Sequence, residues 1–295
     1  WSAIFWHSLR AKLMIHRRFP PPSGRRPYRV SVSSQGRGRD NRPVQNTFQT
    51  WVGLAATTII VIAIILLATA AGHAAAALFD VLSEIHEPRA FAAGEIESLI
   101  TARVAASLFA FQAVTVICVL LVNAYRRRVT GSSLLNFSMP RGGLRTLALA
   151  VVALIALATC FASLVLFFNP EALRNDLQPF AEMMRSRTWW LILLAAGVGA
   201  PLAEELLFRG LIFEALRRSP FGFIGAMVIS ALCWALLHAN YSAYGLGAIA
   251  LIGLYLAWLR ERTGSLLAPI VCHSIYNSLI IALMVMTPDS SLSAG

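Results

Sequence analysis

The sequence predicts an all-α, polytopic membrane protein, a helical bundle with about seven transmembrane helices. Hydrophobic residues make up 57% of the 295 residues and charged residues only 13%, whereas soluble domains carry about 25% charged residues. The mean hydropathy is +0.66. Several charge-free stretches reach the length of about 20 residues that a membrane-spanning helix needs. This composition excludes a disordered chain, a disulfide scaffold and a collagen-like protein.

The predicted spans follow from the charge-free stretches. They are 51–71, 104–125, 146–168, 188–217, two helices within 219–259 and 264–286. Asn240-Tyr241-Ser242 is the expected turn between the two helices of the long stretch, because it carries the polar and small residues that turns favour. Residues 51–290 therefore form the predicted transmembrane domain.

Residues 1–50 form a separate, basic segment. They hold ten basic residues against a single acid, Asp40, in a chain of formal net charge +11. A stretch rich in Pro, Ser, Gly and Arg cannot build a core, so we expect a largely disordered cytoplasmic tail. Residues 1–19 are expected to form an interfacial amphipathic helix and not a cleaved signal peptide. The expected partner of the tail is anionic lipid and not nucleic acid, since no nucleic-acid recognition fold is apparent.

The loops predict the orientation. If the amino end is cytoplasmic, the inner segments hold 19 basic residues and the outer segments five, as the positive-inside rule requires. Only one basic residue is Lys, a bias typical of GC-rich genomes. The expected location is the inner membrane of a bacterium, with multiple passes.

Charges interrupt the fourth predicted span. Glu204, Glu205 and Arg209 all lie within it, and each charge at mid-bilayer costs roughly 2.5–3.5 kcal/mol. Glu205 and Arg209 are four residues apart and can pair on one face. Glu204 points about 100° away from Glu205 and is expected to be the less well satisfied carboxylate. Pro201 just before them is expected to kink or open the helix.

Two later spans carry further polar groups. His238 ends the fifth span, while His273 and Asn277 share one face of the last. A rise of about 1.5 Å per residue places these three side chains and Glu204 within about a dozen ångströms of one depth in the bilayer. We therefore expect them to surround a common polar site.

This residue set suits hydrolysis of an amide by water. A desolvated Glu can act as general base, and His and Asn side chains can orient the water or stabilise an oxyanion. The same residues leave a second possibility open, a Zn²⁺ ion held by Glu204, His238 and His273 with one position for water. The helical HExxH zinc motif is absent, and the residues alone require no cofactor.

Three motifs in order resemble those of the CPBP intramembrane peptidases. They are Glu204-Glu205-x-x-x-Arg209-Gly210, Trp234-x-x-x-His238 and His273-x-x-x-Asn277. The family includes type II CAAX prenyl endopeptidases and bacteriocin-processing or immunity relatives. The resemblance covers about residues 185–286, and the family often carries Phe where this chain has Trp234.

The resemblance implies an all-helical endopeptidase that cleaves a membrane-anchored, CAAX-like peptide or protein. It implies that Glu204 activates the water and that the remaining site residues are Glu205, Arg209, His238, His273 and Asn277. Two alternatives stay open. One is a non-catalytic relative that acts in bacteriocin immunity or as a membrane scaffold. The other is a proton-coupled transporter in which Glu204 carries the proton.

Overall fold

A computed structural model of the chain describes residues 47–86 and 93–286. These residues form helices joined by short turns, and no strand occurs among them. The predicted all-α bundle is therefore confirmed. Residues 1–46 of the predicted tail, which include the amphipathic helix expected over residues 1–19, lie outside the described residues, as do residues 87–92 and 287–290 of the predicted domain. Residues 47–50, predicted as tail, are helical.

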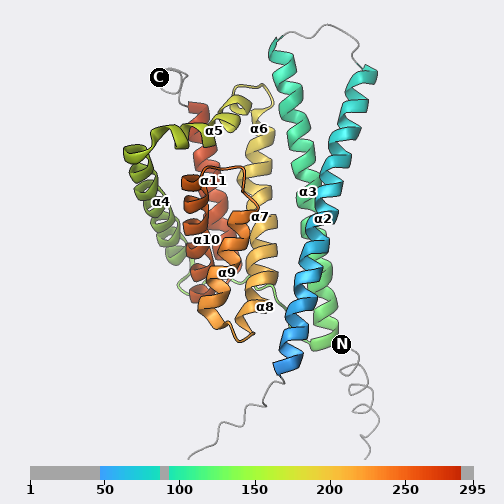
Figure 1. Ribbon diagram of the computed structural model, residues 1–295, viewed down its shortest axis with the longest axis vertical. Helices are drawn as coiled ribbons and strands as arrows, with labels where there is room; N and C mark the ends of the chain where they lie inside the picture. Colours follow the sequence, from blue (N-terminus) through green and yellow to red (C-terminus); the bar gives the residue numbers. More distant parts are fainter. Residues whose placement is uncertain (1–46, 87–92, 287–295) are drawn as a thin grey trace, which may run out of the picture. The chain divides into compact units, whose positions relative to one another are not determined.

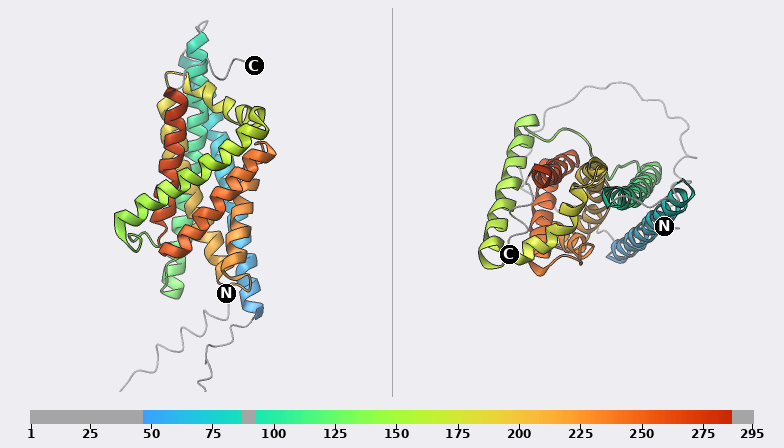
Figure 2. Two further views of the ribbon diagram at one scale, coloured as in Figure 1. Left: turned by 90° about the vertical axis from the view of Figure 1, so that its left-hand side faces the viewer. Right: turned by 90° about the horizontal axis from the view of Figure 1, so that it is seen from above.

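The first two predicted spans form a long antiparallel pair. Helix α2 (Thr47–His86) packs along α3 (Ala93–Thr130), and both are longer than predicted. Helix α2 continues past residue 71 through an alanine-rich stretch, which favours the helical conformation. Figures 1 and 2 show the pair on one side of the central helices and α4 (Gly143–Phe168) on the other.

The fourth span is a helix that changes its hydrogen-bond register twice. Two π-helical segments, η1 and η2, flank the short α-helix that carries Glu204 and Glu205. The expected opening near Pro201 thus takes the form of π-helical turns, which often occur at functional sites. The segments in order are α6 (Trp189–Ile192), η1 (Leu193–Gly199), α7 (Ala200–Glu205), η2 (Leu206–Ile212) and α8 (Phe213–Arg217).

The remaining spans are α9 (Gly222–Leu236), α10 (Ala243–Thr263) and α11 (Leu267–Met286). The predicted turn at 240–242 is confirmed, and the Ser242 hydroxyl accepts a hydrogen bond from Gly245 N at the start of α10. Six helices in the described part of the chain are long and apolar enough to cross a membrane, and α9 is a shorter apolar helix. This agrees with the prediction of about seven spans.

Helix α5 (Pro170–Met184) was not predicted. Asn169 caps it by accepting a hydrogen bond from Ala172 N, and Pro170 occupies its first turn, where proline is tolerated. It contacts α4, α6, α10 and α11. Asp176 joins α5 to the turn before α10, because its carboxylate accepts hydrogen bonds from Ser242 N at 2.7 Å and Ser242 Oγ at 2.6 Å.

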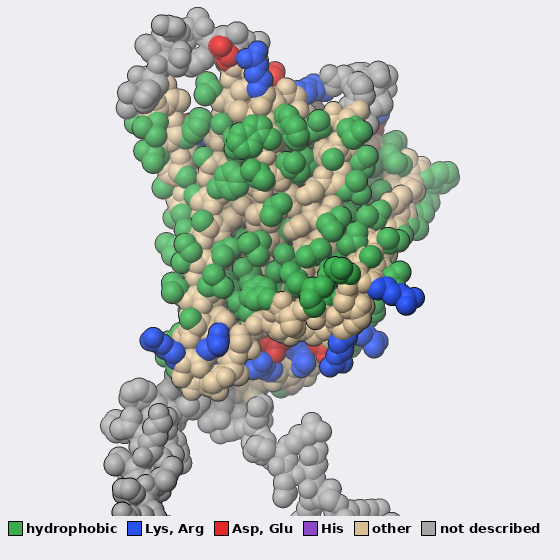
Figure 3. Space-filling model, turned by 180° about the vertical axis from the view of Figure 1, so that it is seen from behind, with side chains coloured by type: hydrophobic (Ala, Val, Ile, Leu, Met, Phe, Trp, Pro, Cys, Tyr) green, Lys and Arg blue, Asp and Glu red, His purple; other side chains and the backbone are tan. Residues whose placement is uncertain are grey.

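The surface has the polarity pattern of a membrane protein. Hydrophobic side chains cover the middle of the face in Figure 3, and Lys and Arg gather at one end. Arg217 at the end of α8 pairs with Glu261 at 2.6 Å, and Arg218 pairs with Glu214 at 2.7 Å. The chain is an integral, multi-pass membrane protein, and the cytoplasmic side of the amino end stays a prediction.

Candidate active site

A buried ion cluster lies at the centre of the candidate site. Arg209 Nη1 donates to Glu205 Oε1 at 2.9 Å, and both side chains are 0% exposed. His273 Nδ1 lies 3.0 Å from the same oxygen. The predicted pairing of Glu205 with Arg209 is confirmed, and it accounts for two of the three charges that lie within residues 204–209 of the fourth span.

Helix α10 supplies a second hydrogen-bond acceptor to the arginine. Arg209 Nη2 donates to the carbonyl of Gly253 at 3.0 Å. A side chain at residue 253 would meet Trp234 Cε3 at 3.0 Å and Ala231 Cβ at 3.1 Å. Glycine therefore allows α9 and α10 to approach closely enough for the Gly253 carbonyl to reach the guanidinium.

Glu204 has a different environment from Glu205. Its side chain is 23% exposed, and Oε2 accepts a hydrogen bond from Trp234 Nε1 at 2.7 Å. His273 Nε2 lies 4.0 Å from the same oxygen. His273 therefore stands between the two carboxylates, with Nδ1 toward Glu205 and Nε2 toward Glu204. Of the two acids, Glu204 is the one that a water molecule or substrate can reach.

The hydrogen bonds determine which imidazole nitrogens carry protons. His238 Nδ1 lies 3.0 Å from the Trp234 carbonyl, which can only accept, so Nδ1 must donate. In neutral His238 the other nitrogen, Nε2, is then an acceptor. The same holds for His273, because Glu205 Oε1 already accepts a hydrogen bond from Arg209 and is an acceptor for Nδ1 as well.

Trp234 connects the parts of the site. Its indole donates to Glu204, and its ring has edge contacts with His273 at 5.2 Å and His238 at 5.5 Å between ring centroids. The Arg209 guanidinium lies 4.8 Å from the Trp234 ring centroid, within cation–π distance. The sequence analysis treated Trp234 only as the aromatic residue of the motif Trp234-x-x-x-His238. An apolar span offers few side-chain N–H donors. The indole N–H of Trp234 could therefore have been recognised as a hydrogen-bond donor to a buried acid.

Asn277 does not join the ion cluster through its amide. Its Nδ2 donates to the carbonyl of Ala196 in η1 at 3.0 Å. In the π register the Ala200 N–H bonds to Ala195, so the next carbonyl, that of Ala196, faces Pro201, which has no N–H. The Asn277 amide thus supplies the donor that the proline lacks.

This arrangement makes a prediction about stability. Asn277→Leu should lower the free energy of unfolding by about 1–3 kcal/mol, the cost of a buried carbonyl left unpaired. The measurement is an SDS titration of the detergent-solubilised protein. In a Pro201→Ala background, where residue 201 regains an N–H, the same substitution should cost clearly less. Equal costs in the two backgrounds would contradict this account.

Tyr241 is a further residue beside the site that sequence reasoning treated only as part of a turn. Its ring centroid lies 6.0 Å from that of His238. Burial, together with the nearby carboxylates of Asp176 and Glu204, raises the pKa of Tyr241 to about 12. Tyr241 therefore presents a neutral hydroxyl at physiological pH.

The zinc site that the sequence left open, held by Glu204, His238 and His273, stays a prediction. Among residues 47–86 and 93–286, no three His, Cys, Asp or Glu side chains are grouped to hold a metal ion. We therefore assign no chemical step to a metal.

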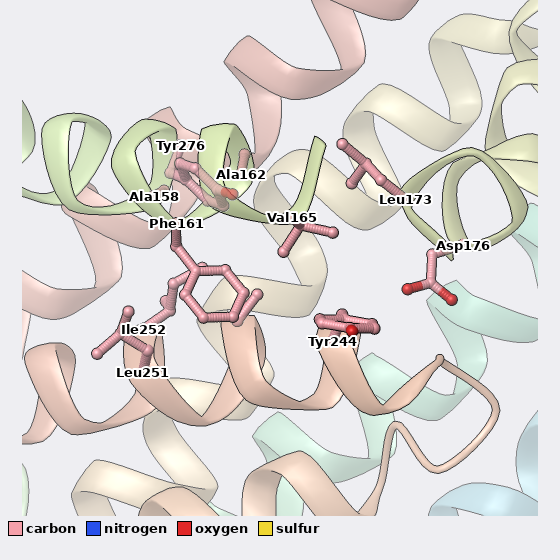
Figure 4. Close-up of a pocket in the computed structure, with 12 residues that line it drawn as sticks. Ala158, Phe161, Ala162, Val165, Leu173, Asp176, Tyr244, Leu251, Ile252 and Tyr276 are labelled. Atoms are coloured by element: carbon pink, nitrogen blue, oxygen red, sulfur yellow. The ribbon is translucent and has the colours of Figure 1, made fainter. Parts of the chain in front are cut away.

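A separate apolar pocket lies between α4, α5, α10 and α11. It encloses about 80 Å³, and its polar lining includes Asp176 and Tyr244. Figure 4 shows Phe161 and Ile252 among the labelled residues of its wall. Tyr276 also lines it, directly before Asn277 in the chain, but none of the charged side chains of the ion cluster does.

Comparisons with known proteins place this site within a recognised family segment. Residues 186–279 match the family model described as type II CAAX prenyl endopeptidase Rce1-like. This segment is about one third of the chain and contains all six predicted site residues. The resemblance inferred from the three motifs is confirmed over this range.

One curated relative is the UPF0177 protein YxdF of Lactococcus lactis subsp. lactis (strain IL1403). It is 30% identical over 81 residues, which are 28% of this chain and 43% of the relative. The chain thus matches less than half of that relative's length. No solved structure matches the chain.

Proposed function

We propose that this chain, whose residues 186–279 match the Rce1-like model, is an intramembrane endopeptidase that uses Glu204 to activate water. The observation that carries the proposal is the difference between the two adjacent carboxylates. Glu205 is fully buried and paired with Arg209, whereas Glu204 is partly exposed and lies 4.0 Å from His273 Nε2. A purely structural ion pair explains Glu205 but not Glu204.

The gap between Glu204 and His273 suits a water molecule. A water that lies about 2.8 Å from both Glu204 Oε2 and His273 Nε2 would sit to one side of the line that joins them. Both groups can accept a hydrogen bond from that water. For His273 this follows because Nδ1 donates to Glu205, which leaves Nε2 as an acceptor. The water would be held by two acceptors with its lone pairs directed outward, toward an incoming carbonyl carbon.

The proposed reaction then proceeds in two steps. Glu204 removes a proton from the water as the oxygen bonds to the carbonyl carbon of the substrate, which gives a tetrahedral intermediate. The protonated Glu204 passes this proton to the amide nitrogen, the carbon–nitrogen bond breaks, and the products are an acid and an amine. Glu205 and Arg209 hold His273 in place. His238 Nε2 is available to a substrate group because Nδ1 is bonded to the Trp234 carbonyl.

The proposed substrate is a membrane-anchored peptide or protein, including CAAX-like peptides. Support comes from the position of the site within apolar helices and from the family of the matched segment. A water-soluble peptide would have to enter the bundle without an apolar group to draw it from solution.

The test is cleavage of quenched fluorescent peptides by protein reconstituted into liposomes. The panel contains a farnesylated Cys-aliphatic-aliphatic-X peptide, its palmitoylated counterpart and the unmodified peptide, each with wild type and with Glu204→Gln. We expect wild type to cleave at least one lipidated peptide and to prefer it to the unmodified one. Folded wild-type protein that cleaves none of the three would contradict the proposal.

Chelation gives a further prediction. Because the proposed base is a carboxylate and the site lacks a three-ligand metal group in the described residues, 1,10-phenanthroline should change kcat by less than about twofold. The control is the non-chelating isomer 1,7-phenanthroline at the same concentration. Loss of cleavage that added Zn²⁺ restores would instead favour the metal mechanism.

A further inference from the structure

The π-helical segment η1 receives side-chain donors from two other helices. Three successive carbonyls, those of Ala195, Ala196 and Gly197, accept hydrogen bonds from outside their own helix. The donors are Gln112 Nε2 of α3 at 2.9 Å, Asn277 Nδ2 of α11 at 3.0 Å and Ser278 Oγ of α11 at 3.4 Å, in the same order. Of these donors only Gln112 lies outside the segment that matches the family model.

Gln112 is closely packed against η1 at both ends of its amide group. The residue is 6% exposed and has apolar neighbours in the chain over residues 108–114 of α3. The other end of its amide, Oε1, faces Gly199 so closely that a Cβ on residue 199 would overlap it. Oε1 has no hydrogen-bond partner within the described residues. A buried unpaired oxygen is costly, so packing alone does not explain a glutamine at this position. The hydrogen bond that its Nε2 donates to Ala195 does explain it.

The register of η1 determines where the two acids point. A π-helical turn bonds residues five apart and not four, so it changes which residues before and after it share a face. Glu204 lies only five residues after Gly199, the last residue of η1. If η1 reverted to α-helical register, the helix that carries Glu204 would rotate by about one residue, or about 100°. Its carboxylate would then leave Trp234 and His273.

We propose that Gln112 is a positioning residue for the peptidase site, because its amide holds η1 in the π register and so orients Glu204. The inference rests on the proposed function. It also assigns the α2–α3 pair a role in the site, since α3 supplies the residue although the family match does not extend to it.

The test uses Gln112→Met, which keeps the length of the side chain and removes the donor. We expect kcat for the cleaved lipidated peptide to fall between about tenfold and a hundredfold, since small misplacements of a reacting group are costly, while KM stays within about twofold. The matched control is Thr115→Val. Thr115 is also buried in α3, but its hydroxyl donates within its own helix, to Phe111 O.

Gly199→Ala provides a second, independent variant. The added methyl group should displace the Gln112 amide and lower kcat to a similar extent. In a Gln112→Ala background, where there is no amide to displace, Gly199→Ala should change kcat by less than about twofold. Effects that multiply in the double variant would contradict the proposal.

Hydrogen–deuterium exchange of residues 193–205 separates this inference from the proposed function. Gln112→Met should raise the exchange of these amides by at least about tenfold, and Thr115→Val by no more than about twofold. Unchanged exchange, or faster exchange with unchanged kcat, overturns the positioning role. If wild type cleaves no peptide, the proposed function and the positioning role both fail, and faster exchange would still identify Gln112 as the residue that holds η1.

Discussion

Replacing Glu204 by glutamine is expected to lower kcat for a lipidated peptide by about 10²–10⁴-fold, the usual contribution of a general base. Gln keeps the shape of the side chain and can still accept the indole hydrogen bond of Trp234, so the fold should be preserved. It cannot take a proton from water. The measurement is the initial rate of cleavage in liposomes at saturating peptide, with the folded fraction of each variant checked by its unfolding transition.

The matched control is Glu261→Gln, the same chemical change at another acid of the bundle. Glu261 pairs with Arg217 near the end of α10, about two turns beyond the Gly253 carbonyl that binds Arg209. It should retain at least about half of the wild-type kcat. If Glu204→Gln also kept half of its activity, Glu204 would not be the base, and the site would have to act in another way.

Removing Arg209 is expected to have the largest effect on stability. Arg209→Met keeps an apolar side chain of similar length but leaves Glu205 as an uncompensated acid at 0% exposure. The Gly253 carbonyl loses its donor as well. Breaking one partner of a buried pair typically costs about 3–5 kcal/mol. We expect a loss of that size in the free energy of unfolding, measured by SDS titration from mixed micelles.

Two further variants determine whether charge is the cause. Arg209→Met combined with Glu205→Gln removes both charges and should be more stable than Arg209→Met alone. Arg217→Met breaks the partly exposed pair with Glu261, whose side chains are 42% and 30% exposed, and should cost about 0–1 kcal/mol. A cost for Arg209→Met as small as that for Arg217→Met would contradict the buried-cluster description.

The membrane bundle could be predicted because hydrophobicity acts locally along the chain. A helix that crosses a bilayer must satisfy its own backbone and expose apolar side chains, so each span carries its own signal. Helix α5 escaped prediction for the same reason. It is short, contains charged residues and carries an internal Pro179, so it has no apolar run that the criterion could recognise.

In the candidate site, too, contacts within one helix could be predicted from the sequence, and contacts between helices could not. The Glu205–Arg209 pair follows from a spacing of four residues on one helix, which geometry alone makes adjacent. The depth argument correctly brought His273 and Glu204 near one level. The contacts that give each group its role join residues far apart in sequence, such as Trp234 to Glu204 and Gln112 to Ala195.

The residue types and their order along the chain thus identified a membrane bundle and predicted acids, imidazoles and an amide near one depth within it. Packing between helices determined that Glu205 is fully buried while Glu204 stays partly exposed, and that Asn277 supports the backbone near Pro201. The physical reason is that burial and hydrogen bonding depend on which atoms of distant helices fill the same space. The π register, which orients Glu204, is stabilised by such donors from α3 and α11.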